Sequence, residues 1–209
     1  MNQMRGFWEE FTESMRAVVG ICLNRPNAEK GLDASLHGFV NSFFAFIVLI
    51  PLFTLLCASQ WDIAYDPNLR EFLAPGISSQ DTLNISFTFF LWTRLAVSLI
   101  HFLAFPAAMF ALTSMLGHKE NYFGFIVGWN WASIPASLLF LLPVVLFKVT
   151  LAAPLLAFPL MALWLVALWI LWRITRMLLK TEWLTSIGVL VLWGALATFF
   201  DLLYSALLV

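Results

Sequence analysis

Charged residues are scarce in this 209-residue chain. They make up 11% of it, while hydrophobic residues make up 62%. A soluble domain carries about 25% charged and about 45–50% apolar residues. A difference of this size excludes an ordinary soluble core and indicates a membrane protein. The formal net charge is −1, and no basic patch stands out, which argues against binding of nucleic acid.

Cysteines and catalytic motifs are scarce as well. We expect the two cysteines, Cys22 and Cys57, at opposite faces of the membrane, so we expect neither a disulfide nor a metal site from them. No Ser/His/Asp order, paired carboxylates or HExxH pattern indicates a catalytic site, and we expect no cofactor. The first residues, MNQMRGFWEEF, turn acidic where the apolar part of a signal peptide would begin, so we expect no secretory leader.

Long apolar runs, in contrast, fill most of the chain. A helix of about 20 apolar residues crosses a bilayer, and five runs reach this length, at about residues 39–58, 83–116, 122–147, 151–172 and 183–208. The sequence therefore predicts an all-α, polytopic membrane helix bundle. We expect a cytoplasmic segment at residues 1–37 and a five-span transmembrane domain at 38–209, with an external loop at 59–82. The short link after the third span leaves open whether residues 143–159 form a full turn or a re-entrant segment.

Residues 4–23 are expected to form an amphipathic helix. Apolar side chains recur there at steps of three and four residues, which is typical of one helical face: Phe7, Trp8, Phe11, Met15, Val18, Val19 and Cys22. Charged residues are expected on the other faces: Glu9, Glu10, Glu13 and Arg16. The helix either packs on the rest of the protein or lies in the membrane interface, and the two interpretations are compatible.

The cationic residues predict the orientation. With a cytoplasmic N-terminus, that side would hold Arg5, Arg16, Arg25, Lys30, Lys119, Arg173, Arg176 and Lys180, and the other side only Arg70 and Lys148. The positive-inside rule therefore predicts a cytoplasmic N-terminus and an external C-terminus. This pattern fits a bacterial inner membrane, although an endomembrane protein would show the same pattern.

A few polar residues lie inside the expected spans. Arg94 and His101 are seven residues apart, so they share one face of the second span. A cation in a membrane helix needs a partner or a route to water. Counting about 1.5 Å per residue places Arg94 and Asp201 in the outer half of the membrane, about one helical turn apart in height. Either the two residues form an ion pair, or Arg94 reaches the external headgroups while Asp201 lies near the outer surface.

His101 and Asn130 complete the candidate intramembrane site. His101 is expected to be a neutral packing residue, or else a proton-linked group that works with Asp201. Asn130 is expected to form a hydrogen bond between helices, or else to bind a substrate. The candidate ion-pair or polar site therefore consists of Arg94, His101, Asn130 and Asp201.

Two short patterns carry a resemblance to a known family. Asn130-Trp131 in the third span and Trp172-Arg173 with Arg176 after the fourth are similar to features of the Yip1-like family of small membrane proteins. From about residue 35 onward, the layout of five spans after an amphipathic segment also resembles this family. The resemblance implies a polytopic membrane protein and no enzymatic chemistry.

Two function classes follow from these observations. The leading interpretation is a non-enzymatic accessory or scaffold protein that binds other membrane proteins or lipids. The alternative is a small transporter or channel built on Arg94, His101, Asn130 and Asp201. A water-filled cavity that joins those four residues would favour transport, whereas a dry, packed interior would favour a subunit of a complex.

Overall fold

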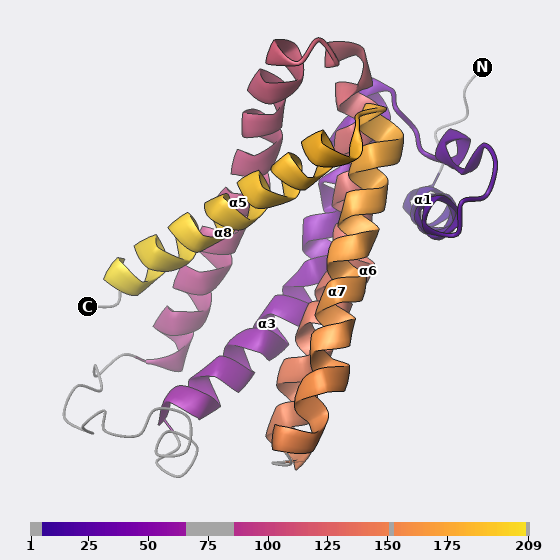
Figure 1. Cartoon of the computed structure of the whole chain (residues 1–209). Helices are drawn as coiled ribbons and strands as arrows, with labels where there is room; N and C mark the ends of the chain where they lie inside the picture. Colours follow the sequence, from indigo (N-terminus) through magenta and orange to yellow (C-terminus); the bar gives the residue numbers. More distant parts are fainter. Residues whose placement is uncertain (1–5, 66–85, 151–152, 208–209) are drawn as a thin grey trace.

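The computed structural model describes residues 6–65, 86–150 and 153–207, which are helical throughout their regular parts and contain no strand. The elements in chain order are α1 (Phe7–Cys22), η1 (Ala28–Gly31), α2 (Leu36–Ser42), α3 (Phe44–Tyr65), α5 (Phe87–Met115), η3 (Lys119–Asn121), α6 (Tyr122–Thr150), α7 (Ala153–Leu179) and α8 (Trp183–Leu207). Five of the described helices are long and apolar enough to cross a membrane. The predicted all-α bundle with five candidate spans is therefore confirmed (Figure 1).

Helix α6 lies at the centre of the bundle. It packs along α7 and contacts α1, α2, α3 and α5. Of its membrane-length window, 61% is buried inside the protein, against 17% for α8. Its apolar side chains are large and enclosed: Phe125, Ile126, Trp129 and Trp131 are each at most 3% exposed. Lipid tails are as apolar as these side chains, so close van der Waals contact, and not removal from water, is what stabilises the packing of α6.

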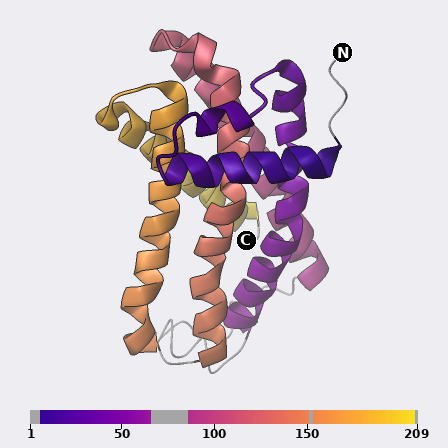
Figure 2. The ribbon, with the colours of Figure 1, turned by 90° about the vertical axis from the view of Figure 1, so that its right-hand side faces the viewer.

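Helix α1 lies across α6 and α7, close to perpendicular to both (Figure 2). One row of its side chains is buried against the bundle: Glu10, Ser14, Ala17, Val18 and Ile21. A second row stays exposed and includes Trp8 and Val19. The helix is thus packed on the protein and still presents an apolar surface, so the two interpretations of this segment are compatible.

The expected position of Glu10 on α1 is wrong. The sequence placed this residue on a charged outer face, but it is buried on the face that contacts the bundle. The reason is a partner that only the tertiary fold provides, because Asn41 Nδ2 donates a 2.7 Å hydrogen bond to Glu10 Oε2. The other end of α1 is held by Arg173, whose Nη2 donates to the Ile21 carbonyl oxygen and to Asn24 Oδ1. A cation at a helix C-terminus is favourable because the last carbonyls carry partial negative charge.

Two helix boundaries differ from expectation. Residues 59–65 continue α3 and do not belong to the expected external loop. In this part of α3, the centroid of the Trp61 ring lies 5.2 Å from that of Phe90 on α5. The remainder of the expected loop, from residue 66 to 82, lies outside the described residues. At the other boundary, α7 continues past residue 172 to Leu179 and keeps Arg176 in its last turn, and Lys180 then adopts a positive φ of 54°.

The link between the third and fourth spans connects two full helices. α6 continues to Thr150 and α7 begins at Ala153, and the two helices lie side by side along their length (Figure 2). Residues 151–152 lie outside the described residues. This arrangement corresponds to the full turn and not to the re-entrant segment.

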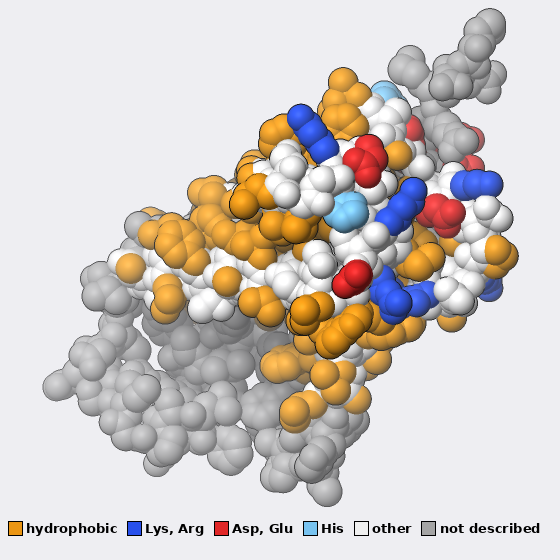
Figure 3. All heavy atoms as spheres, turned by 45° about the horizontal axis from the view of Figure 1, so that its top comes forward, with side chains coloured by type: hydrophobic (Ala, Val, Ile, Leu, Met, Phe, Trp, Pro, Cys, Tyr) orange, Lys and Arg blue, Asp and Glu red, His pale blue; other side chains and the backbone are white. Residues whose placement is uncertain are grey.

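Among the described residues, most charged side chains lie at one end of the bundle. Figure 3 shows them together on the face where the N-terminal segment and the turns lie, while hydrophobic side chains cover the shafts of the helices. The described cations on these elements are Arg16, Arg25, Lys30, Lys119, Arg173, Arg176 and Lys180. The sequence predicts these cations on one side of the membrane. Arg70 and the side chain of Lys148, which are expected on the other side, lie outside the described part of the chain, so the orientation stays a prediction.

Candidate functional site

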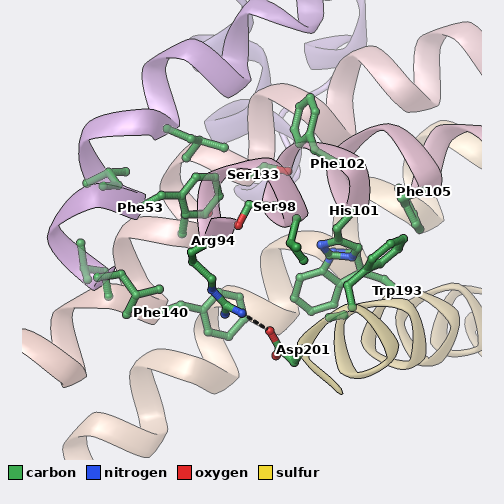
Figure 4. Close-up of a pocket in the computed structure, with 18 of the residues that line it drawn as sticks. Phe53, Arg94, Ser98, His101, Phe102, Phe105, Ser133, Phe140, Trp193 and Asp201 are labelled. Carbon is green, nitrogen blue, oxygen red and sulfur yellow. Dashed lines mark hydrogen bonds and ion pairs between the residues drawn. The ribbon is translucent and has the colours of Figure 1, made fainter. Parts of the chain in front are cut away.

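A cavity of about 360 Å³ lies between α3, α5, α6 and α8 (Figure 4). Each helix contributes one face, because the lining residues recur at helical spacing. From α5 these are Arg94, Val97, Ser98, His101, Phe102 and Phe105; from α6 they are Trp129, Asn130, Ser133, Ser137, Phe140 and Leu141. From α3 they are Leu49, Leu52, Phe53 and Leu56, and from α8 they are Trp193, Ala197, Phe200 and Asp201.

All four residues of the candidate site line this cavity. Arg94 and His101 reach it from α5, Asn130 from α6 and Asp201 from α8. In Figure 4 the side chains of Arg94 and Asp201 point toward each other, and His101 lies beside Trp193. Residues that are separated by more than one hundred positions in the chain thus line one partly open cavity.

Arg94 and Asp201 form an ion pair. Arg94 Nη1 donates to Asp201 Oδ1 over 2.5 Å, and the guanidinium carbon lies 4.9 Å from the centroid of the Tyr204 ring. The Arg94 side chain is 17% exposed and that of Asp201 is 59% exposed. Of the two alternatives for Arg94, the structure contains the ion pair. The cation is therefore enclosed by the protein, while the carboxylate lies at the rim of the cavity.

Asn130 joins α6 to the end of α2. Its Nδ2 donates a 2.9 Å hydrogen bond to Ser42 Oγ, and Ser42 Oγ donates to the Phe39 carbonyl oxygen over 2.7 Å. The predicted hydrogen bond between helices is thus present. Asn130 is 1% exposed, and its Oδ1 has no hydrogen-bond partner among the described residues. A buried acceptor without a partner costs about 1–3 kcal/mol, so Oδ1 is able to accept a hydrogen bond from a bound molecule.

His101 is packed among aromatic rings of α8. Its ring centroid lies 6.3 Å from that of Trp193 and 5.7 Å from that of Phe200. Its Nε2 is buried and has no partner among the described residues. The contacts with rings agree with a packing role for His101.

Stacked aromatic rings form much of the cavity wall. The Phe105 and Trp129 rings stack at 4.4 Å, and the Phe140 and Trp193 rings stack at 6.0 Å. Trp129 and Trp193 are themselves in edge contact at 6.2 Å. Such pairs add about 0.5–1.5 kcal/mol each beyond the area that they bury. The wall is therefore a continuous apolar surface across α5, α6 and α8.

Several hydroxyl groups that line the cavity, or bond to a residue that lines it, were not among the predicted site residues. Ser133 and Ser137 lie on the same face of α6 as Asn130, and Ser42 is the partner of the Asn130 amide. The spacing of residues 130, 133 and 137 is a helical stripe that the sequence contains. Ser98 shares a face of α5 with His101 for the same reason. No sequence pattern indicates Ser42, because its contact depends on how α2 packs.

The chain has no match among known proteins: no protein-family model, no curated protein and no solved structure matches it.

Proposed function

We propose that this protein binds a small solute inside the membrane and acts as a small transporter. The observation that carries this proposal is the cavity on which Arg94, His101, Asn130 and Asp201 converge. Intramembrane polar groups that face a cavity mark solute or ion pathways, because their desolvation is costly elsewhere. This outcome favours the alternative interpretation of the sequence over the scaffold interpretation.

The size and lining of the cavity support the proposal. A volume of about 360 Å³ corresponds to roughly a dozen water molecules at about 30 Å³ each. It also lies within the range of about 300–1,000 Å³ that is typical of ligand sites. Its walls are mainly apolar and aromatic, with a few polar groups that converge, and this combination is the usual composition of such sites.

Location and family form part of the same proposal. The cations at one end of the bundle support a cytoplasmic N-terminus, so the Arg94–Asp201 pair would lie in the outer half of a bacterial inner membrane. The five-span layout after a helix that lies across the bundle agrees with the Yip1-like resemblance.

A second candidate function is an accessory subunit, and one observation favours it. Only 17% of the membrane-length window of α8 is buried inside the protein, and Val191, Phe199 and Leu202 are exposed along it. An apolar surface of this kind can be covered by another membrane protein, which is what the subunit function requires, or by lipid. Purification in a gentle detergent tests this candidate: a co-purifying membrane protein supports it, and a clean monomer counts against it.

Cysteine accessibility tests the transporter proposal. In a background with Cys22 and Cys57 replaced by alanine, the Ser98→Cys and Ser137→Cys variants are reconstituted in nanodiscs and treated with a small hydrophilic thiol reagent. We expect rapid labelling at both positions, because the cavity admits water. The control is Val191→Cys, which is exposed on α8 outside the cavity lining and faces lipid in this proposal.

A blocking variant makes the test more specific. Ala197→Trp places a bulky ring in the cavity and should slow labelling at the Ser98→Cys position, whereas Ala195→Trp, on the exposed side of the same helix, should not. If the cavity cysteines react no faster than Val191→Cys, the interior is dry and the proposal is overturned.

A further inference from the structure

We infer that the ligand of this cavity is a small amphipathic carboxylate whose head group takes the place of Asp201 on Arg94. The inference rests on the solute-binding function proposed above and specifies its substrate class. It follows from the unequal exposure of the two partners in the ion pair, together with the composition of the wall.

The two charges differ in what their separation would cost. Arg94 is 17% exposed, so leaving it without a partner would strand a cation that is enclosed by protein. Breaking a buried pair in this way is strongly destabilising. Asp201 is 59% exposed and lies at the rim of the cavity, where the water of the proposed solute pathway would reach it, so it can be released from the pair and stay hydrated there. A ligand that replaces Asp201 as the partner of Arg94 is therefore tolerated. A ligand that binds Asp201 and leaves Arg94 without a partner is not.

This asymmetry selects the charge of the ligand. An anion supplies Arg94 with a new partner at the moment when Asp201 leaves. A cation would have to compete with Arg94 for Asp201, and it would leave the enclosed guanidinium unpaired. The cavity therefore favours an anionic ligand, even though one cation and one anion line it.

The head group is a carboxylate because Asp201 itself shows the chemistry that this place accepts. Its Oδ1 receives the hydrogen bond from Arg94 Nη1, and the guanidinium carbon lies over the Tyr204 ring, 4.9 Å from its centroid. A planar guanidinium held in this way presents its N–H groups in a fork that matches carboxylate geometry. A ligand carboxylate would make the same contact from inside the cavity.

The part of the ligand that lies inside the cavity must be apolar and short. Beyond Arg94, the cavity is walled by aromatic rings that include Phe53, Phe102, Phe140 and Trp193. The volume of about 360 Å³ holds roughly a dozen non-hydrogen atoms when each takes about the space of a water molecule. A medium-chain acid such as octanoate meets both conditions. The acid could come from the aqueous phase or, as a longer chain that protrudes, from the bilayer.

Binding of radiolabelled octanoate to the full chain in phosphatidylcholine nanodiscs tests the inference. We expect saturable binding at pH 7.5 that unlabelled octanoate displaces and that octanamide and octylammonium do not displace. Palmitate as a competitor distinguishes the sources: stronger displacement by palmitate than by octanoate assigns the ligand to the bilayer, and weaker displacement assigns it to the aqueous phase. Displacement by octylammonium, or equal displacement by octanamide, would overturn the inference.

Two variants examine the ion pair directly. Arg94→Gln should weaken octanoate binding by about tenfold or more, because it removes the charged partner. Asp201→Asn should tighten binding by about tenfold, because it removes the internal competitor for the guanidinium. The controls are Arg176→Gln and Glu182→Gln, which make the same charge changes at exposed positions at the opposite end of the bundle and should leave binding unchanged.

The Asp201→Asn variant keeps the test decisive if Arg94→Gln does not fold. Unchanged or weaker octanoate binding by folded Asp201→Asn protein would overturn the inference, since a purely structural ion pair gives that result. The proposed function fails separately. If cavity cysteines are labelled but octanoate does not bind, the substrate class is wrong while solute binding stands; if labelling fails too, both proposals fall.

Discussion

The Arg94–Asp201 pair gives the sharpest prediction about this protein. We expect a double-mutant cycle with Arg94→Ala, Asp201→Asn and the double variant to be strongly non-additive. Each single variant leaves one charge without its partner inside or at the edge of the bundle, whereas the double variant removes both charges. The double variant should therefore be more stable than the sum of the two single effects implies.

The size of the coupling follows from the geometry. At an effective dielectric constant of about 20, two unit charges about 4 Å apart attract by about 4 kcal/mol, while exposed pairs contribute about 0.2–1 kcal/mol. The pair joins a mostly enclosed Arg94 to an Asp201 that is 59% exposed, so it lies between these limits. We expect a coupling free energy of about 2 kcal/mol, within the range of about 0.5–3 kcal/mol for residues in contact.

Equilibrium unfolding in mixed micelles of mild detergent and SDS measures this coupling. The helical signal in far-UV circular dichroism follows unfolding of the wild type and the three variants. Additive effects within about 0.5 kcal/mol would show that the two side chains act independently, which refutes the ion pair as a stabilising contact. Arg176→Ala combined with Asp201→Asn is the control cycle and should be additive, because those residues lie on different helices at opposite ends of the bundle.

Three further predictions concern residues in α1 and α2 and their contacts. Ser42→Ala removes the acceptor of a buried Asn130 hydrogen bond and should lower the free energy of unfolding by about 1–3 kcal/mol, measured in the same detergent titration. Gly38→Ala would place its Cβ 2.0 Å from the carbonyl oxygen of Asp33, so we expect a similar loss of about 1–3 kcal/mol, whereas Gly188→Ala has no atom within 4 Å of its new Cβ and should not destabilise. Burial raises the pKa of the Cys22 thiol, and Arg173 opposes part of this effect. The folded protein thus favours the neutral thiol. Its contribution to the free energy of unfolding is complete below the pKa of the thiol in the unfolded chain, and it is lost as the pH rises through the pKa in the folded protein. Melting temperatures between neutral and alkaline pH should fall more in the wild type than in Cys22→Ala, and equal profiles would contradict this.

Properties that depend on local sequence were predicted well. Five apolar runs predicted five candidate spans, because the length and polarity of a segment decide whether it can cross a bilayer. Counting the rise per residue also placed Arg94 and Asp201 at similar heights, because a helix converts sequence position into distance. The same counting could not distinguish an ion pair from an Arg94 side chain that reaches the headgroups, because the backbone of Arg94 lies at the same height in both alternatives.

Properties that depend on contacts between helices required the tertiary structure. The sequence placed Glu10 outside, yet it is buried because Asn41 on α2 supplies a hydrogen bond. It offered no indication that Ser42 binds Asn130, or that faces of four helices leave a cavity between them. The length and polarity of each helix are encoded locally, whereas the neighbours of a polar side chain depend on the rotation and tilt of every helix around it. The sequence alone determined a polytopic helical membrane protein with a few polar residues inside its apolar runs, and only the packing of α3, α5, α6 and α8 decided that those residues share one cavity.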